Sequence, residues 1–208
     1  LRLYSLLPAG VAFVLLVAIV AFSSVLAVVQ NSLALAVSSI AGGFLAPILA
    51  STGQGSHVAL FSYYGVLNAG ILAMAWFKSW RPLNLLGFAF TFVIGIAWGV
   101  MRYQPEFRWS TEPFLVLFFV FYVVIAILYA TRQEPQLKGY VDGTLVFGTP
   151  LIAFGLQTAL MRDIEYGLAY SALAVSAFYL LLATLLYRRQ QASMRLLVEA
   201  FLALGVVF

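Results

Sequence analysis

Only one acidic side chain, Glu199, lies well inside an apolar run of this sequence. A carboxylate within a membrane segment is by default a functional hypothesis, and the usual chemistry is a proton relay. Arg195 stands four residues earlier, at the spacing that brings two side chains onto one face of a helix. An ion pair on one helix is therefore the competing interpretation of Glu199, and we favour it.

Glycine and proline interrupt two apolar runs, at Gly42, Gly43 and Pro47 and again at Gly148 and Pro150. Paired interruptions are the best sequence pointer to a transporter site, because unwound backbone presents carbonyls and helix ends to a solute. The alternative is a kink whose freed carbonyl is satisfied by neighbouring helices. We favour the kink, since Pro47 lies close to a loop and only Pro150 lies near the middle of its run.

Two amide side chains, Asn68 and Gln157, are the most polar groups deep in the apolar runs. Each is expected to hydrogen-bond a neighbouring helix, and lining a solute path is the alternative for both. The candidate path therefore consists of the two amides together with the residues of the two interruptions: Gly42, Gly43, Pro47, Asn68, Gly148, Pro150 and Gln157.

The sequence contains no set of residues typical of a catalytic, cofactor or metal site. His57 is the sole histidine and cysteine is absent, which excludes sites built from several imidazoles or thiolates. Neither a P-loop, nor a zinc-protease helix, nor a serine-hydrolase elbow occurs. We therefore expect no cofactor and no metal, name no catalytic residue, and lean against an enzyme.

Composition identifies the surroundings of these residues. Apolar residues make up 64% of the chain, which has 11 Lys and Arg and 7 Asp and Glu. No Asp, Glu, Lys or Arg occurs from Leu3 to Phe77, whereas about 20 apolar residues span a bilayer. The lipid bilayer is therefore the expected partner, and a net charge of +4 spread over short loops argues against binding of nucleic acid.

Uncharged runs of at least about 19 residues predict seven spans, and an eighth begins near Arg195. The fold class is all-α, a polytopic membrane protein, because the runs are apolar on every face and lack the alternation of barrel strands. We expect a single transmembrane domain, residues 1–208, that is a fragment of a longer protein. The seven complete spans are Pro8–Val29, Ser32–Ala50, Val58–Phe77, Leu83–Met101, Pro113–Thr131, Gly143–Met161 and Tyr166–Tyr187.

Lysine and arginine fall unequally on the two sides of the predicted spans. The side of the N-terminus holds four of these residues and the other side holds seven. Because positive loops stay inside, the loops with Lys78 and Arg81 and with Arg188 and Arg189 are predicted to be cytoplasmic. The loop with His57 is then outside.

Small residues at four-residue spacing predict close helix packing, since small side chains let membrane helices approach. Such ridges are expected on the second and the fourth span. The residues are Ala34, Ser38, Gly42, Ala46 and Ala50 on the second span, and Gly87, Thr91, Gly95 and Gly99 on the fourth. The fifth span has no small residue between Phe114 and Ala126. We therefore expect the fifth span to be peripheral and to face lipid.

A weak internal echo relates Phe44–Pro47 to Phe147–Pro150, and Tyr64-Gly65 to Tyr166-Gly167. It pairs the second span with the sixth and the third with the seventh. A tandem repeat of four helices would follow, with halves 1–104 and 105–208 in parallel orientation.

Six segments that include polar residues resemble a family of large bacterial membrane proteins known as domain of unknown function 2339. The resemblance implies an internal piece of a longer protein of the bacterial inner membrane, with further spans as partners. The family has no agreed activity, so no site residue is carried over. The matching segments are Gly42–Gly65, Ala75–Gly87, Ser110–Phe114, Gly139–Pro150, Arg162–Gly167 and Glu199–Gly205.

Two functions of different classes follow from these patterns. Our first expectation is a transporter-like, solute-translocating core, based on the paired interruptions and the buried amides. The alternative is a non-transporting scaffold or accessory subunit of the cell envelope, based on short loops and the lack of catalytic groups. Homo-oligomers and envelope partner proteins both remain open.

Overall fold

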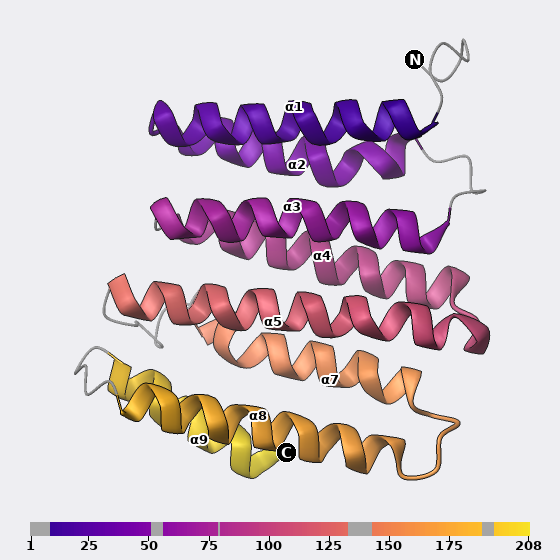
Figure 1. The fold of residues 1–208 in the computed structure, drawn as a ribbon, viewed down its shortest axis with the longest axis vertical. Coiled ribbons are helices and arrows are strands. Elements are labelled where there is room, and N and C mark those ends of the chain that lie inside the picture. The colour runs from indigo at the N-terminus through magenta and orange to yellow at the C-terminus, as the bar shows by residue number, and fades with distance from the viewer. Residues whose placement is uncertain (1–8, 51–55, 79, 133–142, 189–193) are drawn as a thin grey trace. The chain divides into compact units, whose positions relative to one another are not determined.

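The structure is a computed structural model that describes residues 9–50, 56–78, 80–132, 143–188 and 194–208. The described part is helical and contains no strand, as the apolar runs predict (Figure 1). The elements are α1 (Ala9–Val29), α2 (Leu33–Ala50), α3 (His57–Phe77), α4 (Arg81–Arg102), η1 (Pro105–Phe107), α5 (Arg108–Arg132), η2 (Thr144–Gly148), α7 (Thr149–Leu160), α8 (Gly167–Tyr187) and α9 (Arg195–Val207).

The helices match the predicted runs, and the prediction of an all-α membrane protein is confirmed at that level. Among the described residues, four helical segments are long and apolar enough to cross a membrane, and shorter apolar helices accompany them. Eight spans are therefore not shown. The four candidate spans are His57–Phe77, Arg81–Arg102, Pro105–Thr131 and Gly167–Tyr187.

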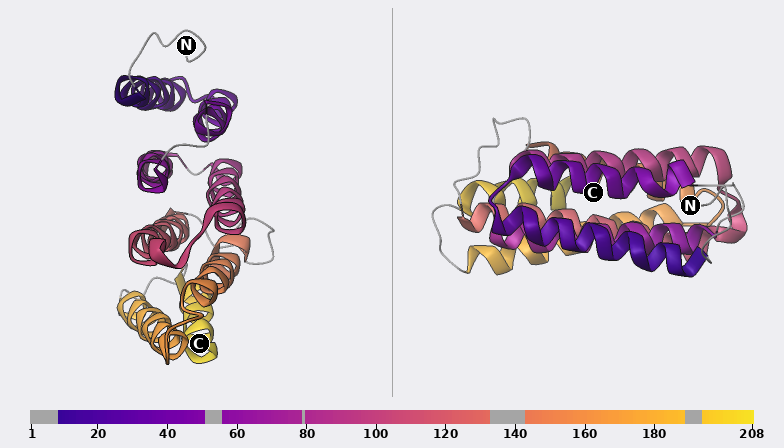
Figure 2. Two further views of the ribbon diagram at one scale, coloured as in Figure 1. Left: turned by 90° about the vertical axis from the view of Figure 1, so that its right-hand side faces the viewer. Right: turned by 90° about the horizontal axis from the view of Figure 1, so that it is seen from above.

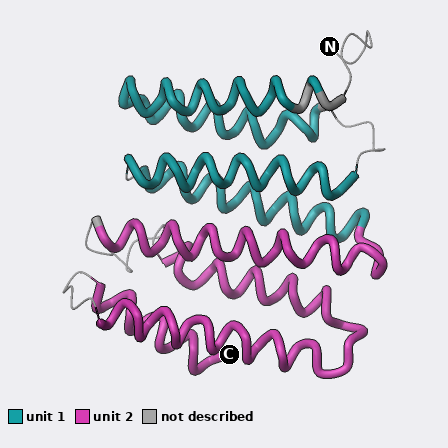
Figure 3. The backbone as a smooth tube through the Cα atoms, viewed as in Figure 1, with its two compact units in different colours: residues 1–102 teal, residues 103–208 magenta. Residues whose placement is uncertain are grey.

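The chain forms two compact units, Leu1–Arg102 and Tyr103–Phe208 (Figure 3). In the first unit α1 and α3 form one layer, and α2 and α4 form a second layer against it (Figure 2). A tight turn joins α1 to α2 because Asn31 adopts a positive φ of 53°, a conformation that asparagine tolerates. Ser32 then caps α2, its Oγ accepting a hydrogen bond from Leu35 N at 3.3 Å.

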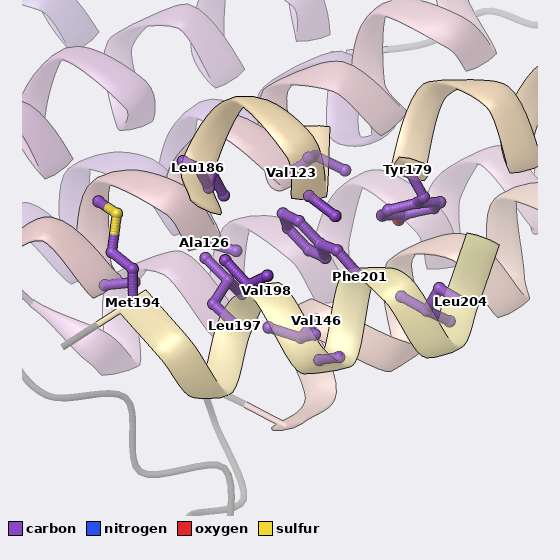
Figure 4. Packing of buried hydrophobic residues seen from close by; sticks show 13 residues of the cluster. Val123, Ala126, Val146, Tyr179, Leu186, Met194, Leu197, Val198, Phe201 and Leu204 are labelled. Atoms are coloured by element: carbon purple, nitrogen blue, oxygen red, sulfur yellow. The ribbon is translucent and has the colours of Figure 1, made fainter. Parts of the chain in front are cut away.

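The second unit is built around a cluster of buried apolar side chains from α5, η2, α8 and α9 (Figure 4). Tyr179 and Phe201 are its largest fully buried members, with ring centroids 5.2 Å apart. Helix α5 contributes Val123, Ala126 and Ala130 to this cluster.

The prediction that the fifth span is peripheral and faces lipid holds for only part of α5. Eight of its residues are buried, whereas Val116 and Leu117 are exposed. Its bulky residues interdigitate with those of other helices, so the lack of small residues does not exclude close packing. The eight buried residues are Leu115, Phe118, Tyr122, Val123, Ile125, Ala126, Tyr129 and Ala130.

Helices α8 and α9 pack tightly against each other at Gly205. A Cβ placed on Gly205 would lie 2.8 Å from Cγ and Cδ2 of Leu180 and 3.3 Å from the backbone N of Leu180. Ser176 on α8 donates its hydroxyl hydrogen to the carbonyl oxygen of Gly205 at 2.5 Å. Glycine at this position therefore permits a contact that a larger residue would obstruct.

The ridge predicted on the second span is wrong from Ala34 to Gly42. Ala34, Ser38 and Gly42 are exposed, and a Cβ on Gly42 would meet no atom within 4 Å. The residue that packs is Gly43, where a Cβ would lie 3.1 Å from Val20 Cγ2 and 3.3 Å from Leu67 Cδ2. The four-residue spacing of small residues correctly indicated one face of a helix, but the face that packs is the neighbouring one, which contains Gly43.

The ridge predicted on the fourth span is correct for its first half. Gly87 and Thr91 are buried, whereas a Cβ on Gly95 or Gly99 would meet no atom within 4 Å. The small residues of this ridge therefore permit close packing only in the first half of α4.

The echoing prolines do not hold equivalent positions in their helices. Pro47 lies in the last turn of α2, whereas Pro150 lies in the first turn of α7. Tyr64 is buried in the body of α3, and Tyr166 precedes α8 with a positive φ of 59°. The matched residues therefore give no support to a repeat, and the tandem repeat of four helices remains a prediction.

Candidate functional site

The helix interruption at Pro47 is closed by a hydrogen bond from another helix. Proline has no N–H, so the carbonyl of Gly43, four residues earlier, loses its helical donor. The hydroxyl of Tyr63 on α3 donates to this carbonyl oxygen at 2.9 Å. Tyr63 is 1% exposed, so the bond is shielded from solvent and lipid, and the kink interpretation agrees with this geometry.

A second tyrosine makes the same kind of contact one residue along α2. Tyr64 donates to the carbonyl of Phe44 at 3.2 Å, and its ring stacks on that of Phe44 with centroids 5.2 Å apart. Gly43, Pro47 and Phe44 thus form a junction between α2 and α3. The carbonyls there accept protein hydroxyls rather than being presented to a solute.

Asn68 lies on α3, fully buried, and bonds to α4 as predicted. Its Nδ2 donates to Thr91 Oγ1 at 2.9 Å, and the Thr91 hydroxyl donates to Asn68 Oδ1 at 3.1 Å. Nδ2 also donates to the carbonyl of Tyr64 at 2.9 Å. The side chain is satisfied inside the first unit, which is what a packing role requires.

Replacing Asn68 by Leu should destabilise the first unit modestly. Interhelical hydrogen bonds in membranes contribute about 0.6 kcal/mol on average and as much as ~1.7 kcal/mol, and the change leaves the Thr91 hydroxyl without this partner. Unfolding of purified protein by a denaturing detergent measures the loss. Adding Thr91→Val should recover part of it, because replacing both partners by apolar groups is nearly neutral; no recovery would contradict the assignment.

Gln157 joins three helices of the second unit. Its Nε2 donates to Oε1 of Glu112 on α5 at 2.8 Å and to Oγ of Ser171 on α8 at 3.1 Å. Ser171 in turn donates to the carbonyl of Gly167 at 2.9 Å. The predicted hydrogen bond between helices is confirmed, and we call Glu112, Gln157 and Ser171 the Glu112 cluster.

Charged residues flank the Glu112 cluster. Arg108, one helical turn before Glu112, lies with its Nη2 3.6 Å from Oδ2 of Asp163. The sequence interpretation missed Glu112 and Ser171, because it began the span at Pro113 and left Glu112 in a loop. Helix α5 begins at Arg108, and Ser110-Thr111 near its start is the kind of polar pair that could have indicated this.

Gly148 and Pro150 lie where a π-helical turn, η2, passes into α7. Proline again removes a helical donor, and a wider turn is a common way to accommodate the change. Thr149 is fully buried, and its Oγ1 has no hydrogen-bond partner within the described part of the chain. Gln157 bonds to Glu112 and Ser171 instead of to these residues, so the second interruption and the Glu112 cluster are separate features.

Glu199 is exposed and paired rather than embedded. Its Oε1 lies 3.1 Å from Nε of Arg195, and the two side chains are 58% and 85% exposed. The predicted ion pair along one helix is confirmed. Exposed pairs of this kind stabilise by only a few tenths of a kcal/mol, and a relay needs a shielded carboxylate.

No group of three or more His, Asp or Glu side chains that could hold a metal occurs within the residues described. The described residues of the Glu112 cluster offer hydrogen bonding and charge.

The positively charged residues used to predict the orientation lie at helix ends. Lys78 directly follows α3, and Arg81 is the first residue of α4. Arg188 follows α8, and Arg189 lies outside the described residues.

Comparison with family models gives a match over the whole chain. The model described as predicted membrane protein (DUF2339) matches residues 1–208. Neither the comparison with curated proteins nor the one with solved structures finds a match.

Proposed function

Because the chain belongs to the DUF2339 family of predicted membrane proteins, we propose that it is a non-transporting, packed helical core that acts as a scaffold or accessory subunit in the bacterial inner membrane. Its apolar helices fit a multi-pass membrane protein. The scaffold role is favoured over transport because the polar groups of the first unit hydrogen-bond to neighbouring helices.

One observation carries this proposal. The carbonyl of Gly43, which Pro47 deprives of its helical donor, accepts the Tyr63 hydroxyl at 2.9 Å. Asn68 is 0% exposed and bonds to Thr91. A solute path needs polar groups free to bind solute, whereas here the groups hold helices to one another.

Solute translocation, the first expectation from sequence, keeps one supporting observation. The Glu112 cluster places a carboxylate, an amide and a hydroxyl at the junction of three helices, all only partly buried. Ionisable groups of this kind mark solute and proton pathways in other membrane proteins. Transport is therefore the second candidate, and it would be confined to the second unit.

Thiol accessibility separates the two functions, since the chain has no native cysteine. The single variant Thr91→Cys measures access of water to the interior of the first unit, and Ser171→Cys does so for the second unit. Ser56→Cys, at an exposed position, is the matched control. A charged, membrane-impermeant reagent should label Ser56→Cys readily and Thr91→Cys at least about tenfold more slowly, because a dry thiol rarely ionises. Fast labelling of Thr91→Cys from either side would overturn the packed core, and fast labelling of Ser171→Cys would favour transport.

The same control variant tests the proposed orientation. The excess of Lys and Arg in the loops around Lys78 and Arg188 predicts that those loops are cytoplasmic, and Ser56 would then face outside. In intact cells the thiol of Ser56→Cys should react without permeabilisation. Reaction only after the cytoplasm is opened would reverse the orientation.

A further inference from the structure

The Glu112 cluster contains a carboxylate that has no cationic partner among the described residues. Glu112 Oε1 accepts a hydrogen bond from the neutral amide of Gln157, whereas the nearby guanidinium of Arg108 pairs with Asp163. A neutral donor solvates a carboxylate but does not cancel its charge. Glu112 is half-buried, so the charge is shielded from water on part of its surface and attracts a cation.

The cluster lies where three helices have their ends. Glu112 is in the second turn of α5, Gln157 in the last turn of α7 and Ser171 in the second turn of α8. Trp109, Tyr166 and Tyr170 lie beside these positions in sequence and are 67–73% exposed. Exposed Trp and Tyr rings prefer the headgroup level of a bilayer, so the cluster is placed among lipid headgroups.

A group suited to an anion stands one turn away. Arg108 and Glu112 are four residues apart on α5 and so share one helix face. The Arg108 side chain is 14% exposed, and its Nε has no hydrogen-bond partner in the described part of the chain. A guanidinium binds phosphate oxygens well, because it presents several donors in one plane. At this spacing the Cβ atoms of the two residues lie about 6 Å apart. One face of α5 thus carries a carboxylate beside a guanidinium that has one unpartnered N–H and also pairs with Asp163.

We propose that Arg108 and the Glu112 cluster bind the headgroup of a phospholipid that carries a primary ammonium, as phosphatidylethanolamine does. The ammonium would donate hydrogen bonds to Glu112, and the phosphate would accept them from Arg108. Phosphatidylcholine carries the same charges but has no N–H to donate, and phosphatidylglycerol has no cation. This inference does not depend on the proposed function, since both a scaffold and a transporter can bind lipid.

Lipid binding to the purified protein tests the proposal. Delipidated protein in mild detergent is mixed with each of the three lipids, and bound lipid is counted by native mass spectrometry. Phosphatidylethanolamine should bind about tenfold more tightly than phosphatidylcholine, the effect expected of a charge-assisted hydrogen bond. Glu112→Gln should abolish this preference. The matched control Glu106→Gln, at an exposed position in η1, should keep it.

Two further variants separate binding from folding. Glu112→Asp keeps the charge and should retain the preference for phosphatidylethanolamine. Arg108→Gln should weaken the binding of all three lipids to the same extent, because all three carry the phosphate. A preference that survives in Glu112→Gln would overturn the proposal, and so would free ethanolamine that binds as tightly as the lipid, since it would make the ligand a soluble amine.

Discussion

Replacing Tyr63 by Phe should destabilise the folded chain by about 1–3 kcal/mol, a large effect for the loss of one oxygen atom. The hydroxyl of Tyr63 donates to the Gly43 carbonyl at 2.9 Å, and Pro47 has no N–H to take its place. In an apolar interior the carbonyl would then lack a donor, which costs more than the bond contributes when it is intact. Unfolding by a denaturing detergent in mixed micelles measures the difference.

The effect should depend on Pro47. Alanine at this position restores an N–H that can bond the Gly43 carbonyl along α2, so Tyr63→Phe should cost markedly less in the Pro47→Ala background. The control is Tyr179→Phe, since the Tyr179 hydroxyl is buried and has no hydrogen-bond partner in the described residues; this change should be neutral or stabilising. If Tyr63→Phe costs as much in the Pro47→Ala background as in the native chain, the Tyr63 hydroxyl does not replace the donor that Pro47 removes.

Replacing Gly205 by Ala should destabilise the second unit by about 1–3 kcal/mol, the usual range for overpacking. The added methyl would lie 2.8 Å from two carbons of Leu180 and 3.3 Å from its backbone N. The side chain can turn away, but the backbone of α8 can move only by separating from α9. Thermal unfolding in detergent, followed by circular dichroism, measures this loss.

The matched control is Gly155→Ala on α7. A Cβ there would meet no atom within 4 Å, and alanine is favoured over glycine in a helix interior by about 1 kcal/mol. Gly155→Ala should therefore be neutral or stabilising. In Gly205→Ala, adding Leu180→Ala removes the two carbons in conflict and should recover much of the loss. A stable Gly205→Ala protein would show that α8 and α9 do not approach so closely.

The helices were predictable from sequence, because charge and turn residues mark their ends. Asn31 and Ser32 separate α1 from α2, and Lys78 closes α3. The start of α5 was missed by five residues, since the rule of uncharged runs excludes the helix start, where Arg108 and Glu112 lie one turn apart. Polar first turns are ordinary at a membrane surface.

Which faces pack was less predictable. Gly42 and Gly43 are neighbours in sequence, yet Gly42 is open and Gly43 contacts Val20 and Leu67. A helix that is apolar all round gives no signal for the packed face. The same limit explains α5, whose bulky residues were assigned to lipid although six of them are buried.

The sequence predicted that polar side chains would form hydrogen bonds between helices, but it did not predict which residues they would bond to. Asn68 and Gln157 were expected to bond neighbouring helices, and both do. Tyr63 was not singled out, because tyrosine is common in membrane helices and only the donor lost at Pro47 explains its role. Glu112 required the partner helices to be placed, since Gln157 lies 45 residues away.

The hydrogen bond between Glu112 and Gln157 also bears on how the chain is made. Glu112 emerges from the ribosome 45 residues before Gln157, which at about 5–20 residues per second corresponds to roughly 2–9 s. During that interval α5 is present without the amide that solvates its carboxylate. A chain that ends between α5 and α7 keeps that state permanently, so truncations of this protein should end before Arg108 or after Ser171.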